Sequence, residues 1–383
     1  MARRGHPGTS GGALPGPPAV PGPEIAAAAD RGAQAAGWLF LGRDGRLTAY
    51  AGCAGGVVRW TESAPGSDRW HGPELFPVEG WGGRFALAQD GDGFVWFAGA
   101  RRREGASGGH EFVVAAQYQT GRPLGEWRTV GNPFPAQEGE AAEPVGPVVL
   151  PDGAGSLHVV VSRFGTGVCG RTRRDDGTWE DWTDYRGQWV RGPVVPLVTS
   201  RGRAEFLAPF RGGATYWSQD RPGSPFRWLG RMEAEAVEGS YTCLRTGPDT
   251  GTYFWRHPAD GSVVAYRPAA PAGPGPHLMP LGGAGGSGPV DAVRTGINGT
   301  DCTVLLQRGA EGYPEIAAYP THGEQYGAWW APVGDRCAGL PALALDAYGS
   351  VAIAMVDTDG RLRVCRQDLT EPGLTFGAWR TVG

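Results

Sequence analysis

Residues 341–383 read PALALDAYGSVAIAMVDTDGRLRVCRQDLTEPGLTFGAWRTVG, and this stretch decides the fold. It holds four short apolar or alternating runs, at 341–345, 351–355, 362–365 and 378–382. The turn-forming pairs Tyr348-Gly349, Asp359-Gly360 and Pro372-Gly373 separate them. Runs of this length bounded by Gly, Pro and Asp are typical of β-strands joined by tight turns. The stretch therefore predicts one unit of four antiparallel strands.

The same unit can be laid over six earlier parts of the chain. Six of the seven units close on a tryptophan that a glycine soon follows: Trp70, Trp127, Trp182, Trp228, Trp329 and Trp379. Successive tryptophans lie 46–57 residues apart, except for one gap of 101 residues that holds a unit with Met279 near the expected place. A period of about 50 residues is typical of propeller blades. We predict an all-β protein, a seven-bladed β-propeller of four-stranded antiparallel blades over residues 37–383.

The individual strands recur with their own signatures. First strands begin at a proline, which is tolerated where no ladder donor is yet needed, at 147–150, 193–195 and 289–293. Second strands are almost wholly apolar, as expected for a strand buried on both faces, at 95–97, 157–161, 206–207, 253–255 and 304–306. Third strands often end in an aromatic residue, at Trp60, Tyr118, Trp217, Tyr266 and Tyr319.

The composition excludes several classes of function. All 35 basic residues are arginine, a bias that suggests a GC-rich genome. The absence of lysine excludes Schiff-base chemistry, a P-loop lysine and Ser-Lys dyads. A net charge of -4 without a long basic block argues against nucleic acid as a partner.

Residues 1–36 are rich in Pro, Gly and Ala and are predicted to form a flexible N-terminal arm, in which the alanine-rich part could form one or two helical turns. An alternative interpretation is that the arm is a peptide through which the protein docks onto a partner. It lacks the apolar region of a secretory signal, and no run in the chain is long and apolar enough to span a membrane. We therefore expect a cytoplasmic protein, or one exported without a classical signal peptide.

No cofactor and no metal are expected. The six cysteines form no paired spacing and are interpreted as buried and reduced, and the seven histidines occupy unrelated repeat positions. Asp90-Gly91-Asp92-Gly93 resembles a calcium loop but stands at a hairpin position and lacks further carboxylates. The segment 175–179 resembles a sialidase Asp-box with one residue too few, and is better interpreted as a turn between third and fourth strands.

Arginine follows the second strand in five units. These residues are Arg101, Arg163, Arg211, Arg256 and Arg308. Residues that recur with the repeat usually belong to the scaffold, so pairing with turn carboxylates or carbonyls is one interpretation. The other is ligand binding, because the turn after the second strand and the connection between blades emerge on the same end of a propeller.

Trp81 and Trp189 are the candidate binding aromatics. Both break the tryptophan register and are expected in connections between blades, on the same end as the arginines. An aromatic ring beside hydrogen-bond donors is a common construction for a sugar site; packing between blades is the alternative. A loop insertion at 101–110 is expected on that end as well.

The repeat pattern resembles the PLL family of bacterial seven-bladed propeller lectins. The residues behind the resemblance run from Arg256 through Asp260-Gly261 to Tyr266, from Val356 through Asp359-Gly360 to Trp379, and from Trp127 to Gly131. The resemblance implies non-catalytic binding of fucose and related sugars between blades. Two other classes stay open: a scaffold subunit that binds a protein partner through its N-terminal arm, and an enzyme whose catalytic groups come from distant blades.

Overall fold

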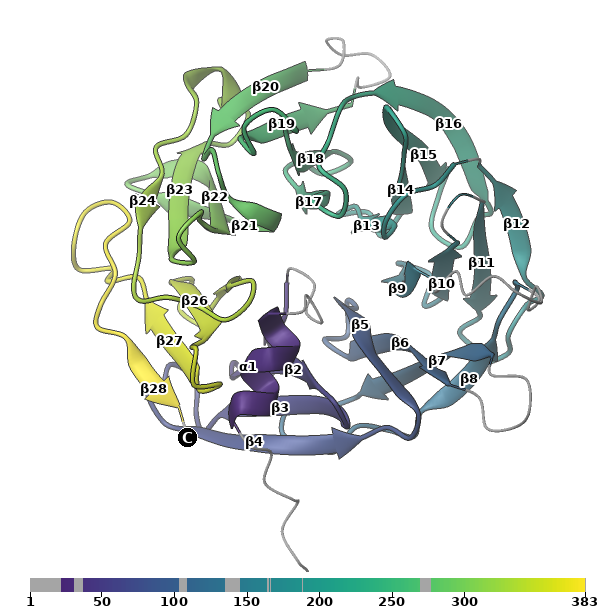
Figure 1. Cartoon of the computed structure of the whole chain (residues 1–383), viewed down its shortest axis with the longest axis horizontal. Coiled ribbons are helices and arrows are strands. Elements are labelled where there is room, and N and C mark those ends of the chain that lie inside the picture. Colours follow the sequence, from purple (N-terminus) through teal and green to yellow (C-terminus); the bar gives the residue numbers. More distant parts are fainter. Residues whose placement is uncertain are drawn as a thin grey trace, which may run out of the picture.

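The computed structural model describes residues 22–30, 37–102, 109–134, 145–163, 165, 167–187, 189–268 and 277–382. Over these residues the chain forms seven four-stranded antiparallel sheets arranged in a ring (Figure 1). The predicted seven-bladed propeller is confirmed. In each blade the first strand lies nearest the central axis and the fourth lies at the rim (Figure 1).

The blades follow one another in chain order, and every blade is built from four consecutive strands. Blades 1 to 4 consist of β1 (Leu39–Leu41), β2 (Leu47–Cys53), β3 (Gly56–Glu62) and β4 (Trp70–Pro77); β5 (Trp81–Gln89), β6 (Val95–Arg102), β7 (His110–Gln117) and β8 (Arg128–Gly131); β9 (Val145–Pro151), β10 (Leu157–Ser162), β11 (Val168–Arg173) and β12 (Thr183–Arg186); and β13 (Val195–Val198), β14 (Ala204–Phe210), β15 (Gly213–Gln219) and β16 (Phe226–Glu233).

Blades 5 to 7 repeat the same order. They consist of β17 (Thr242–Arg245), β18 (Gly251–Arg256), β19 (Val263–Arg267) and β20 (His277–Gly282); β21 (Ser287–Ile297), β22 (Thr300–Arg308), β23 (Pro314–Pro320) and β24 (Ala331–Pro332), with the 3-10 helix η1 (Glu324–Tyr326) before β24; and β25 (Ala342–Leu345), β26 (Val351–Val356), β27 (Leu362–Arg366) and β28 (Arg380–Val382).

Local side-chain hydrogen bonds explain why the template stretch turns where it does. The carboxylate of Asp346 accepts the amide N–H groups of Tyr348 at 2.9 Å and Ser350 at 3.0 Å, which closes the hairpin between β25 and β26. Asp357 does the same in the next turn, toward the amides of Asp359 and Arg361. An Asp that caps its own turn makes the Asp-Gly pattern a reliable turn signal.

The hydrophobic core lies between the blades. Alternate residues of β26 show this most simply: Val351 and Ile353 pack on blade 6, whereas Ala352 and Ala354 pack on blade 1. A strand buried on both faces must be apolar at every position. This arrangement accounts for the continuous apolar runs of the second strands.

Most tryptophans of the repeat pack against the preceding blade, with one exception and one change of register. The exception is Trp228 of blade 4, which is 60 % exposed, while Phe226 packs in the cluster between blades 3 and 4. In blade 6 the packed residue is Trp330, whose indole N–H donates to the carbonyl of Leu281 at 2.9 Å. Trp329, which the spacing indicates, is 89 % exposed. The closing position of this unit is therefore one residue later than predicted, because the backbone before β24 turns the first of the two rings outward.

The predicted N-terminal arm contains one element of the core. Helix α1 (Gly22–Asp30) lies inside the ring beside β2 (Figure 1). Its Ile25, Ala26 and Ala29 are buried in a cluster shared by blades 1 and 7. Residues 22–30 thus belong to the propeller and not to a separate arm. The other residues of 1–36 lie outside the described part of the chain.

In the described part of the chain, neither terminal blade borrows a strand from the other to close the ring. Blades 1 and 7 are each complete, and helix α1 contacts both of them. An ion pair between Glu62 and Arg366 joins the same two blades, and Asp291 of blade 6 accepts the amides of Gly37 at 3.2 Å and Leu343 at 2.8 Å. These contacts substitute for the backbone ladder that strand exchange would provide.

Candidate functional site

The strand order defines two ends of the ring. The turns between second and third strands and the connections between blades share one end, which we call the connection face. On this face Trp189, from the connection between blades 3 and 4, lies close to Arg211, from the turn after β14. Both line a pocket of about 440 Å³ together with Arg191, Phe210 and Arg231. Two of the predicted site residues therefore meet.

Hydrogen bonds fix the backbone that directly follows Trp189. Val190 is fully buried, forms an isolated β-bridge with Phe210, and accepts the amide of Gly165 at 3.0 Å. The amide of Arg191 donates to the carbonyl of Pro209 at 2.8 Å. Trp189 has a positive φ of 63° and a side chain that is 67 % exposed. An exposed indole next to a fixed backbone segment is an aromatic platform that needs little ordering on binding.

Arg231 forms the opposite wall of this pocket. It lies on β16, and its guanidinium carbon is 5.4 Å from the centre of the Phe210 ring, a cation–π contact. The contact restricts the arginine without using its N–H donors. Both Arg211 and Arg231 line the pocket, and in the described part of the chain no ion pair joins either of them to a carboxylate.

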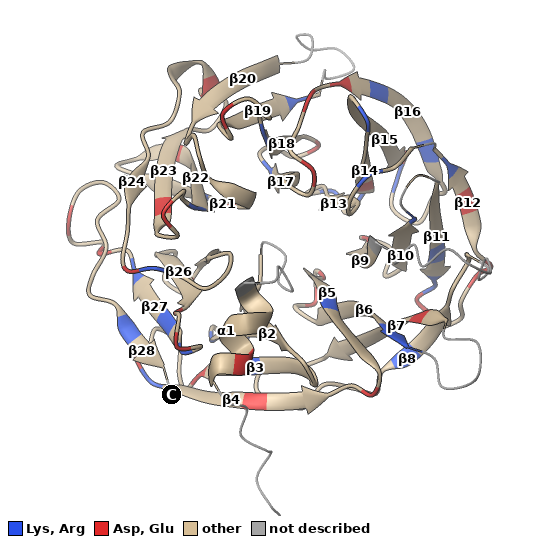
Figure 2. Ribbon diagram, in the orientation of Figure 1, with Lys and Arg blue, Asp and Glu red and all other residues tan. Residues whose placement is uncertain are grey.

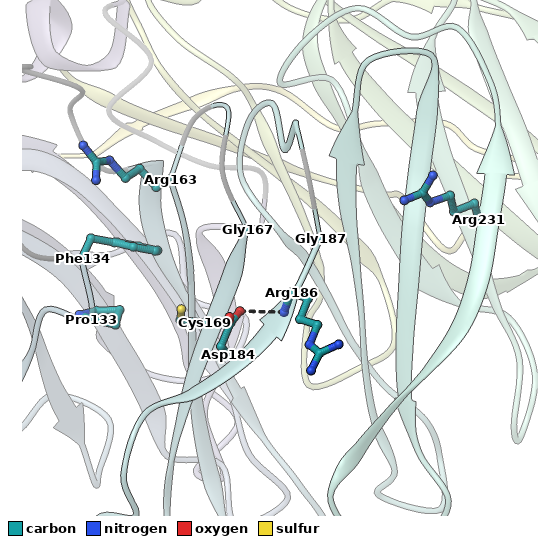
Figure 3. A pocket seen from close by; sticks show the side chains of 9 residues that line it. All are labelled: Pro133, Phe134, Arg163, Gly167, Cys169, Asp184, Arg186, Gly187 and Arg231. Atoms are coloured by element: carbon teal, nitrogen blue, oxygen red, sulfur yellow. Dashed lines mark hydrogen bonds between the residues drawn. The ribbon is translucent and has the colours of Figure 1, made fainter.

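A second pocket, of about 760 Å³, shares Arg231 with the first. Figure 3 shows Asp184 and Arg186 between Phe134 and Arg163 on one side and Arg231 on the other. The remaining lining residues are Pro133, Gly167, Cys169 and Gly187. The predicted site residue Arg163 therefore belongs to this neighbouring pocket.

The charges of the second pocket are mainly positive. Asp184 is the one carboxylate among its described lining residues, and it accepts the backbone amide of Arg186 at 2.7 Å. Burial, together with the charge of Asp184, raises the pKa of Cys169 to about 11, so this thiol is neutral at physiological pH. The pocket thus combines three guanidinium groups with one carboxylate.

Trp81 has a different environment from Trp189. It is the first residue of β5 and not part of a connection, and its ring lies 5.4 Å from that of Trp127 and 6.1 Å from that of Phe85. It also covers Gly99, where a Cβ would come within 2.5 Å of the indole. Its indole nitrogen is buried and has no hydrogen-bond partner among the residues that the structure describes. These contacts fit the packing interpretation of Trp81.

Two of the predicted arginines have partners that fit the scaffold interpretation. Arg101 donates from Nε to Glu111 at 2.6 Å across β6 and β7. Arg256 is 1 % exposed, and its guanidinium donates to the carbonyl of Gly288 and the side chain of Gln307 in blade 6. Burial lowers the pKa of Arg256 to about 10. Arg256 thus joins blades 5 and 6.

Arg308 lies elsewhere, on the wall of the central channel. This channel has a volume of about 670 Å³ and is lined mainly by the first strands of the blades, with Ala29 of α1 at one end. Its walls are largely apolar, and Asp291 lies in them. The structure therefore separates Arg308 from the pocket that holds Trp189 and from its neighbour.

The remaining sequence candidates have local roles or lie outside the described residues. Residues 103–108 of the predicted loop insertion lie outside the described residues. In the turn that resembles a calcium loop, Asp90 accepts the amides of Asp92 and Phe94 and the indole N–H of Trp96. Among the described residues, no three His, Cys, Asp or Glu side chains lie close enough to hold a metal ion. No helix in the described ranges is long and apolar enough to cross a membrane.

Three residues of the surface were not indicated by the sequence. Arg186 and Phe210 end β12 and β14, whereas Arg231 lies within β16, so the three occupy no common place in the repeat. The one signal in the sequence is that Arg191 stands two residues after Trp189. The twist of a blade and its tilt against the next decide which rim side chains meet, and neither is encoded in spacing.

No family model and no curated protein matches this chain. Solved structures share its fold. The BP39L lectin from Burkholderia pseudomallei is similar over 91 % of this chain and 99 % of its own, with a TM-score of 0.65 and 12 % identity. The NanB sialidase from Streptococcus pneumoniae is similar over 90 % of this chain and 67 % of its own, with a TM-score of 0.47 and 11 % identity. At these identities the likeness concerns the fold.

Proposed function

We propose that this propeller is a lectin-like, non-catalytic carbohydrate-binding protein whose principal site is the pocket formed by Trp189, Arg191, Phe210, Arg211 and Arg231. The single observation that carries the proposal is an exposed indole next to a fixed backbone segment and beside guanidinium donors. A sugar ring offers an apolar CH face and a set of hydroxyl groups. The indole would stack on the former, and the guanidinium groups would donate to the latter.

Two further points support carbohydrate as the ligand class. The pocket volume lies within the range of about 300–1,000 Å³ in which small-molecule sites fall. The repeat resembles that of the PLL lectins, and the BP39L lectin shares the fold over nearly its whole length. The alternative, a scaffold docked through residues 1–36, must contend with the burial of α1 against the propeller's own blades.

A glycan array probed with the full chain tests the proposal. The full chain is the proper sample because α1 contributes to the core. We expect binding to a defined group of saccharides, lost in Trp189→Ala and retained in Trp329→Ala. Trp329 is the matched control, since it is even more exposed, at 89 %, and lines neither pocket. An array without binding would contradict the proposal and favour the scaffold.

A further inference from the structure

We infer that the preferred ligand is an acidic oligosaccharide, carrying carboxylate or sulfate groups, that spans the two adjoining pockets on the connection face. This inference rests on the proposed carbohydrate binding and names the class of saccharide. The juxtaposition that carries it is a set of five arginines lining two pockets that share Arg231, one of which also holds Trp189.

The charge of this surface is opposite to that of the whole protein. The chain has a net charge of -4, yet the two pockets together are lined by five arginines and one acidic residue, Asp184. The arginines are Arg163, Arg186, Arg191, Arg211 and Arg231. Figure 2 shows basic residues on β16, which carries Arg231. A basic pocket on an acidic protein attracts anions selectively to that place.

Three of these guanidinium groups have no acidic partner among the described residues. Within the described residues, Arg186, Arg211 and Arg231 form no ion pair. By contrast, Arg227, on the same strand as Arg231, pairs with Asp220 at 2.7 Å. A guanidinium matches carboxylate and sulfate oxygens through two parallel hydrogen bonds. Neutral sugars do not require so many charges.

Arg231 connects the two pockets. It lines both, so an anionic group that contacts it can belong to a chain whose neighbouring sugars occupy either side. Trp189 provides stacking in the smaller pocket, and Phe134 provides an apolar wall in the larger one. Two pockets that share one wall favour an oligosaccharide over a single sugar.

Asp184 and Cys169 do not remove the excess of positive charge in the two pockets. The Asp184 carboxylate already accepts the amide of Arg186 at 2.7 Å. Burial keeps the Cys169 thiol protonated by raising its pKa to about 11. The surface thus remains positive at physiological pH.

Calorimetric titrations with matched saccharides test the inference. Tetragalacturonate and its fully methyl-esterified form differ in charge but share a backbone, and maltotetraose and sulfated maltotetraose provide the same comparison for sulfate. We expect at least one acidic member to bind about tenfold or more tightly than its neutral match, with an affinity that falls as salt is raised. The two pairs distinguish carboxylate from sulfate.

Variants of equal charge locate the binding. Arg231→Gln should lower the affinity for the acidic saccharide about tenfold or more. Arg227→Gln, on the same strand and outside both pockets, removes the same charge and should leave the affinity within about twofold. Circular dichroism melting of both variants should give unchanged folding, since both side chains reach the surface.

The outcomes separate this inference from the proposed function. One outcome is that neutral saccharides bind, that Trp189→Ala abolishes this binding and that Arg231→Gln leaves it unchanged. This outcome would overturn the preference for an acidic ligand but would support the proposed carbohydrate-binding function. Equal binding of inorganic polyphosphate would also overturn this preference, because charge alone would then explain the affinity. No binding of any saccharide would overturn both.

Discussion

Gly334, which follows the closing tryptophan of blade 6, lies directly against the indole of Trp379 in blade 7. A Cβ on Gly334 would come within 2.5 Å of the ring, and the residue has a φ of +82°. Gly283 of blade 5 has the same relationship to Trp330 of blade 6. The glycine of one unit thus makes room for the tryptophan of the next, which explains why both recur together in the repeat.

Replacing Gly334 by alanine is therefore expected to destabilise the fold by about 3 kcal/mol, the sum of a left-handed backbone penalty and a steric clash. Gly373→Ala is the matched control. Gly373 also has a positive φ, +83°, but a Cβ added there would meet no atom within 4 Å. Urea denaturation should show a loss of only about 1 kcal/mol for the control. Equal losses in the two variants would refute the interlocking of blades.

Ile25 provides a test of the role of α1. Its side chain is 1 % exposed in the cluster between blades 1 and 7, so Ile25→Ala should cost about 3 kcal/mol of unfolding free energy. Ala27→Ser, on the exposed side of the same helix, should change stability by no more than about 0.5 kcal/mol. Urea denaturation curves measure both. Identical curves for the two variants would show that α1 does not help to close the ring.

Asp291 makes stability depend on pH between about 4 and 6. Burial raises the pKa of this carboxyl from 3.8 to about 6 in the folded protein. Because the folded state then binds more protons than the unfolded state, the contribution of Asp291 is fully favourable below pH 4 and is lost as the pH rises through 6. The loss is about 3 kcal/mol at most.

Comparing wild type with Asp291→Asn isolates this effect, since burial also raises the pKa of Glu62 and Glu205 in both proteins. The difference in unfolding free energy between the two should change steadily across the window, with wild type losing more as the pH rises. A difference that is constant from pH 4 to 6 would show that Asp291 does not titrate there.

The cysteines should be inert in the folded protein. All six are free, and burial raises the pKa of each thiol, to about 12 for Cys243 and Cys365. Thiolate is the reactive form, so iodoacetamide at neutral pH should modify the native protein far more slowly than the protein in guanidinium chloride. Intact-mass spectrometry measures both rates, and rapid labelling of the native protein would contradict the burial of these thiols.

The sequence predicted the architecture well because the repeat pattern reflects short-range interactions within each unit. Asp346 caps its own turn, and the alternate residues of 351–356 face alternate neighbours, so strand positions follow from short-range patterns. The packed tryptophan of blade 6 was placed one residue early, at Trp329 instead of Trp330, because spacing does not tell which of two adjacent rings turns inward.

The candidate site was predictable only in part. Topology was sufficient to place Trp189 and Arg211 on one face, because strand reversals decide which turns share an end. The contribution of Arg231 depends on how β16 lies against the preceding blade, a long-range feature without a local pattern. For the same reason, a shared face did not imply a shared site for Trp81, whose ring is packed against Trp127 and Phe85.

Titration of the saccharide that binds best on the array into wild type, Trp189→Ala and Trp329→Ala tests the central claim most directly. Stacking on an exposed indole predicts a loss of about tenfold or more in affinity for Trp189→Ala, with Trp329→Ala within about twofold of wild type. Unchanged affinity in Trp189→Ala, with the variant folded, would contradict the assignment of this pocket as the carbohydrate site.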